Sequence, residues 1–120
     1  MAYSRHQLGA RAEDAAARWL VAGGWAVLER RWRIAEGELD LVCREPLGTL
    51  VGVEVRARTG RRTGSALESI DPWRVARLRR ALAAYAAASG ERGELRLDLV
   101  TAELVSGGWR LSRLAAIDGW

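Results

Sequence analysis

The chain of 120 residues contains no lysine, one cysteine and one histidine, and each shortage removes a class of site. The single cysteine, Cys43, excludes an internal disulfide and a cluster of thiolate metal ligands. The single histidine, His6, is expected to be a solvated side chain rather than a metal ligand. Because all 19 basic side chains are arginines, any one arginine is less informative than it would be in an average protein.

Long apolar segments are also missing. There is no run of about 18 apolar residues, so we expect no transmembrane helix. The N-terminus lacks the apolar core of a signal peptide, which predicts a cytoplasmic protein that does not bind membranes. A hydrophobic content of 49% and a charged content of 28% are typical of a soluble globular protein. The length predicts one domain, residues 1–120, with a single core.

The balance of charge favours an anionic partner. The formal net charge is +4 at pH 7, which suits a polyanion such as nucleic acid. The planar guanidinium of arginine also matches the geometry of phosphate oxygens. Residues 30–33 place Trp32 among three arginines. This cluster could hold a nucleic-acid backbone while the indole stacks on a base, or it could be a solvated strand end.

Periodicity and end signals predict two helices and five strands. We expect the first helix to run from Leu8 to about Ala22, after a frayed N-terminus. The second should begin at Pro72, with Asp71 as its N-cap, and end at Gly90. The expected strands are residues 25–33, two runs within residues 37–58, residues 94–103 and residues 109–114. The first helix should bury a stripe that contains Leu8, Ala12, Ala15 and Trp19. This order predicts an α/β or α+β domain whose mixed central sheet is flanked by helices.

Residues 37–58 carry the strongest chemical signal. The first run alternates Leu39 and Leu41 with Glu38 and Asp40, and the second alternates Val51, Val53 and Val55 with Gly52, Glu54 and Arg56. If the two runs pair as a hairpin, three carboxylates and an arginine gather on one side of the sheet. Close carboxylates repel each other and resist burial, and a bound Mg²⁺ or Mn²⁺ would remove both problems. The alternative is a solvated outer face.

The register of this hairpin separates the two interpretations. A four-residue loop at residues 45–48 places Asp40 opposite Val53. A five-residue loop, or one bulge, places Asp40 opposite Glu54 instead. A metal site therefore predicts an irregular hairpin.

Several arginines lie before the expected start of the second helix and in its first turns. Arg58, Arg61 and Arg62 lie in or beside a glycine-containing loop that follows the strand with Glu54. Arg74 and Arg77 follow in the helix. These five side chains could hold the phosphates of a nucleic acid that flank a scissile bond at a metal site. A plain surface loop and a solvated helix face are the alternatives.

Five sequence features together resemble the YraN family of bacterial proteins, over residues 4 to about 104. The features are Gly9-x-x-x-Glu13-x-x-Ala16, Gly37-Glu38-Leu39-Asp40-Leu41-Val42, Val53-Glu54-Val55-Arg56, Pro72, and Arg96-Leu97-Asp98-Leu99-Val100. That family looks like a branch of the restriction-endonuclease-like PD-(D/E)xK superfamily, which is related to archaeal Holliday-junction resolvases. The resemblance implies a three-layer α/β fold and a cytoplasmic Mg²⁺-dependent endonuclease that acts on DNA.

The resemblance also implies roles for individual residues. Asp40 and Glu54 match the metal-binding acids of the superfamily, Glu13 adds an acid from the first helix, and the Val55 carbonyl completes the inner ligand shell. Arg56 stands where the superfamily has its catalytic lysine. Resolvase-like activity would favour a homodimer, because a four-way junction is cut at two symmetric positions.

Arg56 leaves two functions open. Arginine does not give up its proton, so Arg56 cannot act as a general base, although it can stabilise negative charge. Arg74 likewise stands where the family has a helix lysine, and Leu39 replaces the proline common before the first acid. The first hypothesis is a metal-dependent nuclease. The alternative is a catalytically inactive nucleic-acid-binding module that retains the fold. A protein-interaction domain is a third, with Trp109 and Trp120 as candidates for a dimer surface.

Overall fold

The computed structural model describes residues 3–59 and 70–118. Within these ranges the chain forms the predicted order of helices and strands. The elements are α1 (Arg5–Ala22), β1 (Ala26–Ile34), β2 (Gly37–Arg44), β3 (Leu50–Thr59), α2 (Pro72–Ser89), β4 (Leu95–Val105) and β5 (Gly108–Leu114).

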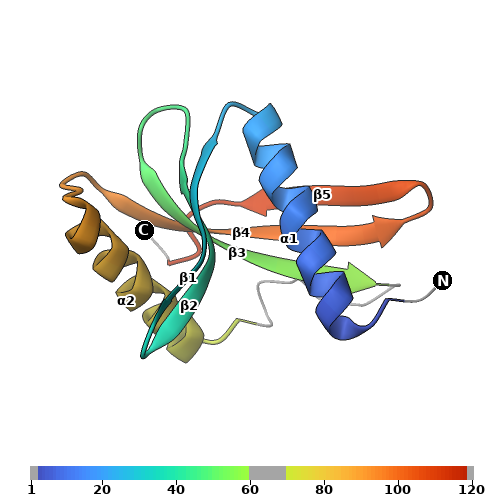
Figure 1. The fold of residues 1–120 in the computed structure, drawn as a ribbon, viewed down its shortest axis with the longest axis horizontal. Helices are drawn as coiled ribbons and strands as arrows, with labels where there is room; N and C mark the ends of the chain where they lie inside the picture. Colours follow the sequence, from blue (N-terminus) through green and yellow to red (C-terminus); the bar gives the residue numbers. More distant parts are fainter. Residues whose placement is uncertain (1–2, 60–69, 119–120) are drawn as a thin grey trace.

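The strands form one mixed sheet in the order β1-β2-β3-β4-β5. All neighbours are antiparallel except β3 and β4, which are parallel and are linked by the segment that contains α2. Figure 1 shows α1 crossing in front of the sheet, with α2 packed beside the β1–β2 hairpin. The predicted fold class is confirmed, since a mixed sheet between two helices is compatible with a three-layer restriction-endonuclease-like fold.

Each helix covers its own face of the sheet. On the α1 side, Ala16 and Leu20 pack against a buried cluster of Leu41, Cys43, Val51, Val53 and Val100. On the α2 side, Leu78, Ala81, Leu82 and Ala86 pack against Leu39, Val42, Leu50 and Leu97. Two separate cores on opposite faces explain why the central strands are apolar in both phases.

The first helix begins three residues earlier than predicted. Ser4 Oγ accepts a hydrogen bond from Gln7 N at 3.1 Å, and Gln7 Oε1 accepts one from Ser4 N at 2.9 Å. This capping box satisfies two amide groups at the helix start, so the chain is helical from Arg5 and is not frayed there. The predicted burial of Trp19 is also wrong, because its indole is 38% exposed at the edge of the stripe.

The second helix has the predicted ends. Asp71 Oδ1 accepts a hydrogen bond from Arg74 N at 2.8 Å, and Pro72 occupies the first helical turn. Gly90 ends the helix with a left-handed φ of 74°, a conformation that glycine adopts without a steric penalty. These signals fix where the side chain of Arg74 leaves the helix. Neither helix is long and apolar enough to cross a membrane, as far as the described residues go.

Candidate metal site at the fork between β2 and β3

The β2–β3 hairpin has the register that a metal site requires. Arg44 pairs with Leu50, which leaves a five-residue loop at residues 45–49, and the last pair is Leu41 with Val53. Just beyond this last pair lie Asp40 on β2 and Glu54 on β3, which are therefore opposite each other. Beyond this point β3 continues to Thr59 beside β4, whereas its pairing with β2 stops. The five-residue loop confirms the predicted irregularity of the hairpin. At the other end of the hairpin β2 and β3 separate, and we call this opening, with Asp40 and Glu54 at its base, the fork.

The predicted alternation along β2 is wrong at this position. Leu39 belongs to the α2-side core, whereas Leu41 packs on the α1 side, so the strand changes face at Asp40. Gly52 makes room for the change, because a Cβ there would lie 3.0 Å from Leu39 Cδ2. Opposite Asp40 on β1, Arg31 has a φ of 55°, which is unusual for a residue with a side chain. The backbone distortion frees the Asp40 side chain from both cores.

Asp40 lies inside the fork. Its Oδ2 accepts a hydrogen bond from Val55 N at 2.7 Å, so the carboxylate takes the place of a strand partner. Burial and the nearby charge of Glu54 raise the pKa of Asp40 to about 8, although the Val55 amide acts in the opposite direction. The charge of Glu13 raises this pKa further. Asp40 is thus close to both of the other predicted acids.

Glu54 is nearly inaccessible and is held by arginines. Its side chain is 2% exposed, and Oε2 accepts from Arg74 at 2.8 Å (Nε) and at 2.6 Å (Nη2). Arg56 Nη2 lies 3.5 Å from the same oxygen. The other oxygen, Glu54 Oε1, has no hydrogen-bond partner, and Arg56 Nε is also buried without one. A protonated Asp40 can donate a hydrogen bond to the Glu54 carboxylate, but once Asp40 is ionised this oxygen has no donor and is open to a cation.

Glu13 approaches the fork from α1, on the face of the sheet opposite α2. Its carboxylate is 13% exposed and accepts a hydrogen bond from Arg31 Nε at 3.1 Å. Arg30 Nη2 lies 3.7 Å away. The structure therefore brings Glu13, Asp40 and Glu54 into one region, but an arginine holds Glu13 aside.

The donors at the fork fit a hard divalent cation with few protein ligands. Two adjacent carboxylates share the space where Glu54 Oε1 lacks a donor, and Val55 can add its carbonyl. In the described ranges, no three His, Cys, Asp or Glu side chains are gathered closely enough to hold an ion. Mg²⁺ commonly binds through one or two carboxylates and keeps several waters, so this donor set suits Mg²⁺ or Mn²⁺.

The predicted phosphate-binding arginines are only partly accounted for. Arg61 and Arg62 lie outside the described residues, and Arg58 is half-buried near the end of β3. Arg77 is exposed and borders a hollow of about 140 Å³ that is also lined by Gly37, Glu38, Arg74 and Leu78. Sequence reasoning missed Trp73, which is 79% exposed in the first turn of α2, although helical periodicity places it opposite the buried Leu78 and Leu82.

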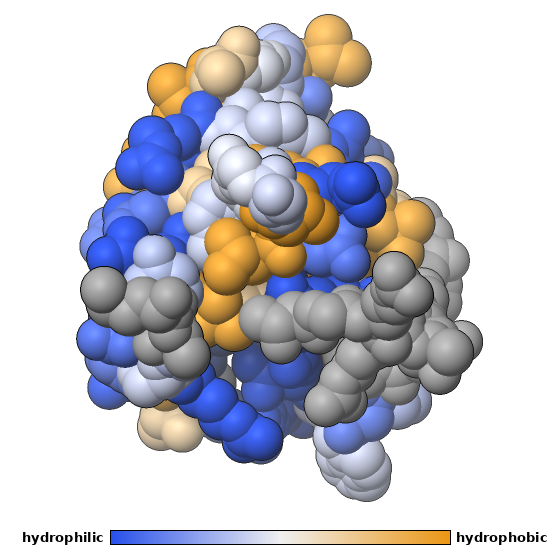
Figure 2. Space-filling view, turned by 90° about the vertical axis from the view of Figure 1, so that its right-hand side faces the viewer, coloured by the Kyte–Doolittle hydropathy of each residue, from blue (hydrophilic) through white to orange (hydrophobic). Residues whose placement is uncertain are grey.

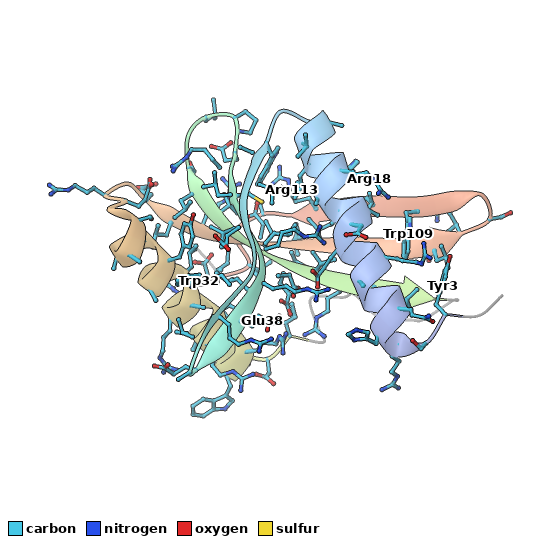
Figure 3. All side chains as sticks on the ribbon, viewed as in Figure 1. Tyr3, Arg18, Trp32, Glu38, Trp109 and Arg113 are labelled. Atoms are coloured by element: carbon cyan, nitrogen blue, oxygen red, sulfur yellow. The ribbon has the colours of Figure 1, made fainter. Side chains whose placement is uncertain are left out.

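The Trp32 indole in the basic cluster of β1 is not available to stack on a base. Trp32 is partly buried, donates from Nε1 to the Ala81 carbonyl at 3.0 Å, and meets Tyr85 edge to face. It lies among the side chains between β1 and α2 (Figure 3). Arg30, Arg31 and Arg33 pair with Asp14, Glu13 and Glu38, respectively. The interpretation of Trp32 as a stacking platform is therefore wrong.

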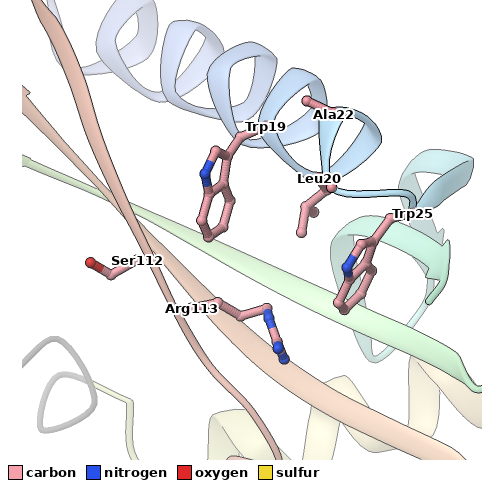
Figure 4. A pocket seen from close by; sticks show the side chains of 7 residues that line it. Trp19, Leu20, Ala22, Trp25, Ser112 and Arg113 are labelled. Carbon is pink, nitrogen blue, oxygen red and sulfur yellow. The ribbon is translucent and has the colours of Figure 1, made fainter. Parts of the chain in front are cut away.

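A wider hollow of about 540 Å³ lies away from the acids. The end of α1 and the edge strand β5 form it, with Trp19, Trp25 and Arg113 among its lining residues (Figure 4). Arg113 stacks over Trp25 at 5.1 Å, which fills part of the space between them. The end of the molecule that carries the β4–β5 turn and the start of α1 shows apolar side chains among hydrophilic ones (Figure 2). Trp109 is half-buried, and Trp120 lies outside the described residues.

Comparison with known proteins agrees with the sequence motifs. Residues 12–102 match the model of the family described as "Uncharacterised protein family UPF0102". A UPF0102 protein of Deinococcus radiodurans is 44% identical over 116 residues, which cover 95% of this chain and 93% of that protein. A relative in Leifsonia xyli subsp. xyli, also named a UPF0102 protein, is 41% identical over 80% of this chain and 81% of its own length. The resemblance to the YraN family is thus confirmed, and the chain belongs to the UPF0102 family.

Proposed function

We propose that this protein is a metal-dependent nuclease of the PD-(D/E)xK type that binds DNA and cleaves its phosphodiester bonds, with branched or damaged DNA as the substrate class. The observation that carries the proposal is the pair of Asp40 and Glu54 at the β2–β3 fork. The two acids are adjacent and partly or fully buried, and one Glu54 oxygen lacks a donor. Arg74 and Arg56 balance the charge of Glu54, so a second ionised acid beside it is unfavourable unless a further cation binds there.

The residues of the fork can share the work of phosphodiester cleavage. Asp40, Glu54 and the Val55 carbonyl would hold Mg²⁺ or Mn²⁺, and Glu13 would hold its water ligands. When bound, the ion would activate water and neutralise charge that develops on the phosphate. Arg56 cannot remove a proton, but its guanidinium would stabilise negative charge beside the ion.

The approach to the fork suits a phosphate backbone. Arg77 is exposed and lines the hollow that Arg74 also lines, and Trp73 is exposed one turn earlier on α2. Arg77 would contact a phosphate and Trp73 would stack on an unpaired base. Arg58 lies on the strand that leads away from Glu54, and Arg61 and Arg62 follow it in the sequence.

Removal of Asp40 should abolish metal binding. We expect calorimetry to detect Mn²⁺ binding to the wild type and none to Asp40→Ala, because that variant loses one of the two carboxylate ligands. Asp14→Ala is the matched control. Asp14 is an exposed acid on α1 that pairs with Arg30, so its loss should leave Mn²⁺ binding unchanged. Equal Mn²⁺ affinities for the wild type and Asp40→Ala would refute a metal site at the fork.

A second candidate function is a nucleic-acid-binding module without catalysis. It is favoured by one observation: Arg56 and Arg74 already neutralise Glu54 without a metal ion. In that case the acids at the fork would be a structural remnant, and the basic surface would bind DNA alone.

Arg56→Lys separates the two functions. A lysine next to Glu54 could lose its proton when desolvated, so we expect the rate of DNA cleavage to rise at least about tenfold. The measurement is single-turnover cleavage of nicked, branched and single-stranded DNA with Mn²⁺. Arg110→Lys makes the same change at an exposed position on β5, away from the fork, and should not alter the rate. Inactivity of both the wild type and Arg56→Lys on every substrate would favour the binding module.

A further inference from the structure

Arg74 holds one of the two oxygens through which Glu54 would bind a metal ion. Its guanidinium donates two hydrogen bonds to Glu54 Oε2, at 2.8 Å from Nε and at 2.6 Å from Nη2. The Glu54 side chain is 2% exposed, so this pair is shielded from the solvent on the carboxylate side. Charge-assisted bonds to a buried carboxylate are among the strongest polar contacts in proteins.

The ion pair puts the arginine in competition with a divalent cation. A metal ion that binds Glu54 would lie close to the guanidinium, and two cations repel each other at short range. If Arg74 stays in place, this repulsion lowers the affinity of Glu54 for the ion, so tight binding requires that Arg74 moves away. The unpartnered Oε1 shows that the arginine satisfies only half of the carboxylate.

The side chain of Arg74 can move away from Glu54 into a neighbouring hollow. Its side chain is 38% exposed, and the anchor at the Asp71 cap involves only its backbone amide. It borders the hollow of about 140 Å³ that Arg77 also lines, one helical turn further along α2. A phosphodiester group there would offer the guanidinium two oxygens in the geometry that arginine prefers.

We propose that Arg74 is an autoinhibitory contact, which a phosphodiester backbone releases. Without nucleic acid, Arg74 occupies the Glu54 carboxylate and keeps metal affinity low. A phosphate at the hollow between Arg74 and Arg77 draws the guanidinium away, and the carboxylate then accepts the ion. Metal and DNA consequently bind with positive coupling, and the coupling is the same in both directions. The inference rests on the proposed metal site at the fork, and it assigns a control to that site.

The test measures Mn²⁺ affinity by calorimetry, without and with a DNA duplex whose linkages are phosphorothioates that resist cleavage. For the wild type we expect the duplex to tighten Mn²⁺ binding at least tenfold. Arg74→Gln should bind Mn²⁺ at least tenfold more tightly than the wild type without DNA, and the duplex should then add less than threefold. Arg80→Gln removes the same charge from an exposed position further along α2, outside the hollow, so it should keep the wild-type affinity when DNA is absent.

The outcomes separate this inference from the proposed function. If Arg74→Gln and the wild type bind Mn²⁺ equally and Asp40→Ala does not bind it, the autoinhibitory contact is refuted and the metal site stands. If neither Arg74→Gln nor the wild type binds Mn²⁺ even with DNA, the metal site itself fails.

Arg74→Gln leaves Glu54 with a weaker partner and could unfold. In that event Mn²⁺ should restore its folding, which thermal melting with and without the ion would show. Arg74→Lys keeps a positive charge but loses the two-point contact, and it should bind Mn²⁺ more tightly than the wild type. An affinity of Arg74→Lys equal to that of the wild type would count against the inference.

Discussion

Asp98→Asn should lower the free energy of unfolding by about 3 kcal/mol, although the substitution hardly changes the size of the side chain. Asp98 is completely buried, and its carboxylate accepts four hydrogen bonds. The donors are Arg96 Nε and Nη2, Arg113 Nη1 and the Ala116 amide, at 2.8–3.0 Å. Loss of the negative charge would leave two arginines, 27% and 34% exposed, without their counter-ion. Their partial exposure keeps the expected loss at the lower end of the range for broken buried pairs.

The measurement is urea unfolding at constant pH, with Glu103→Gln as the matched control. Glu103 is also on β4 and pairs with Arg110 of β5 at 3.1 Å, but both side chains are exposed to solvent. Its loss should cost less than about 1 kcal/mol, since exposed ion pairs add little to stability. Similar losses for the two variants would show that the Asp98 network is no stronger than a surface pair.

Asp98 belongs to a motif of the family but has a structural role, unlike the motif acids Asp40 and Glu54 at the fork. The stretch Arg96-Leu97-Asp98-Leu99-Val100 is part of the family resemblance, yet Asp98 ties together β4, β5 and the segment at Ala116. It accepts no bond from a residue of the fork. We therefore expect Asp98→Asn to change stability while Mn²⁺ binding by the folded protein stays the same.

The sequence predicted the fold well because its signals are local. The cap at Asp71, the glycine at Gly90 and the apolar periods of the strands each act within a few residues. The hairpin register was reduced to two alternatives, and the five-residue loop at residues 45–49 decided between them. The start of α1 is set by the capping box of Ser4 and Gln7, which lies before the apolar stripe that marks the rest of the helix.

The partners of the site residues could not be predicted in the same way. Arg74 lies 20 positions from Glu54, and Arg31 lies 18 from Glu13, so their ion pairs depend on how the helices dock on the sheet. The change of face at Asp40 depends on the room above Gly52, which only tertiary packing reveals. The sequence therefore predicted that Asp40 and Glu54 lie together, but not that arginines hold Glu13, Glu38 and Glu54.

Mn²⁺ affinity should rise on the order of 50-fold between pH 6 and pH 8, since a metal ligand must lose its proton first. Burial and the charge of Glu54 raise the pKa of Asp40 to about 8. At pH 6 only about 1% of Asp40 would be ionised, and at pH 8 about half, which gives this ratio for the release of one proton. An acid with an ordinary pKa would be fully ionised across the same range and would give a flat profile.

Calorimetry in two buffers with different ionisation enthalpies can count the protons released. At pH 7 we expect about 0.9 protons released for each Mn²⁺ bound, because nearly all Asp40 carboxyls are protonated before binding. Glu13→Gln is the informative comparison, since the charge of Glu13 contributes to the raised pKa of Asp40. Its removal should shift the midpoint of the pH profile downward and leave the slope unchanged. A flat profile with no proton release would mean that Asp40 is already ionised at pH 6, and the raised pKa would be refuted.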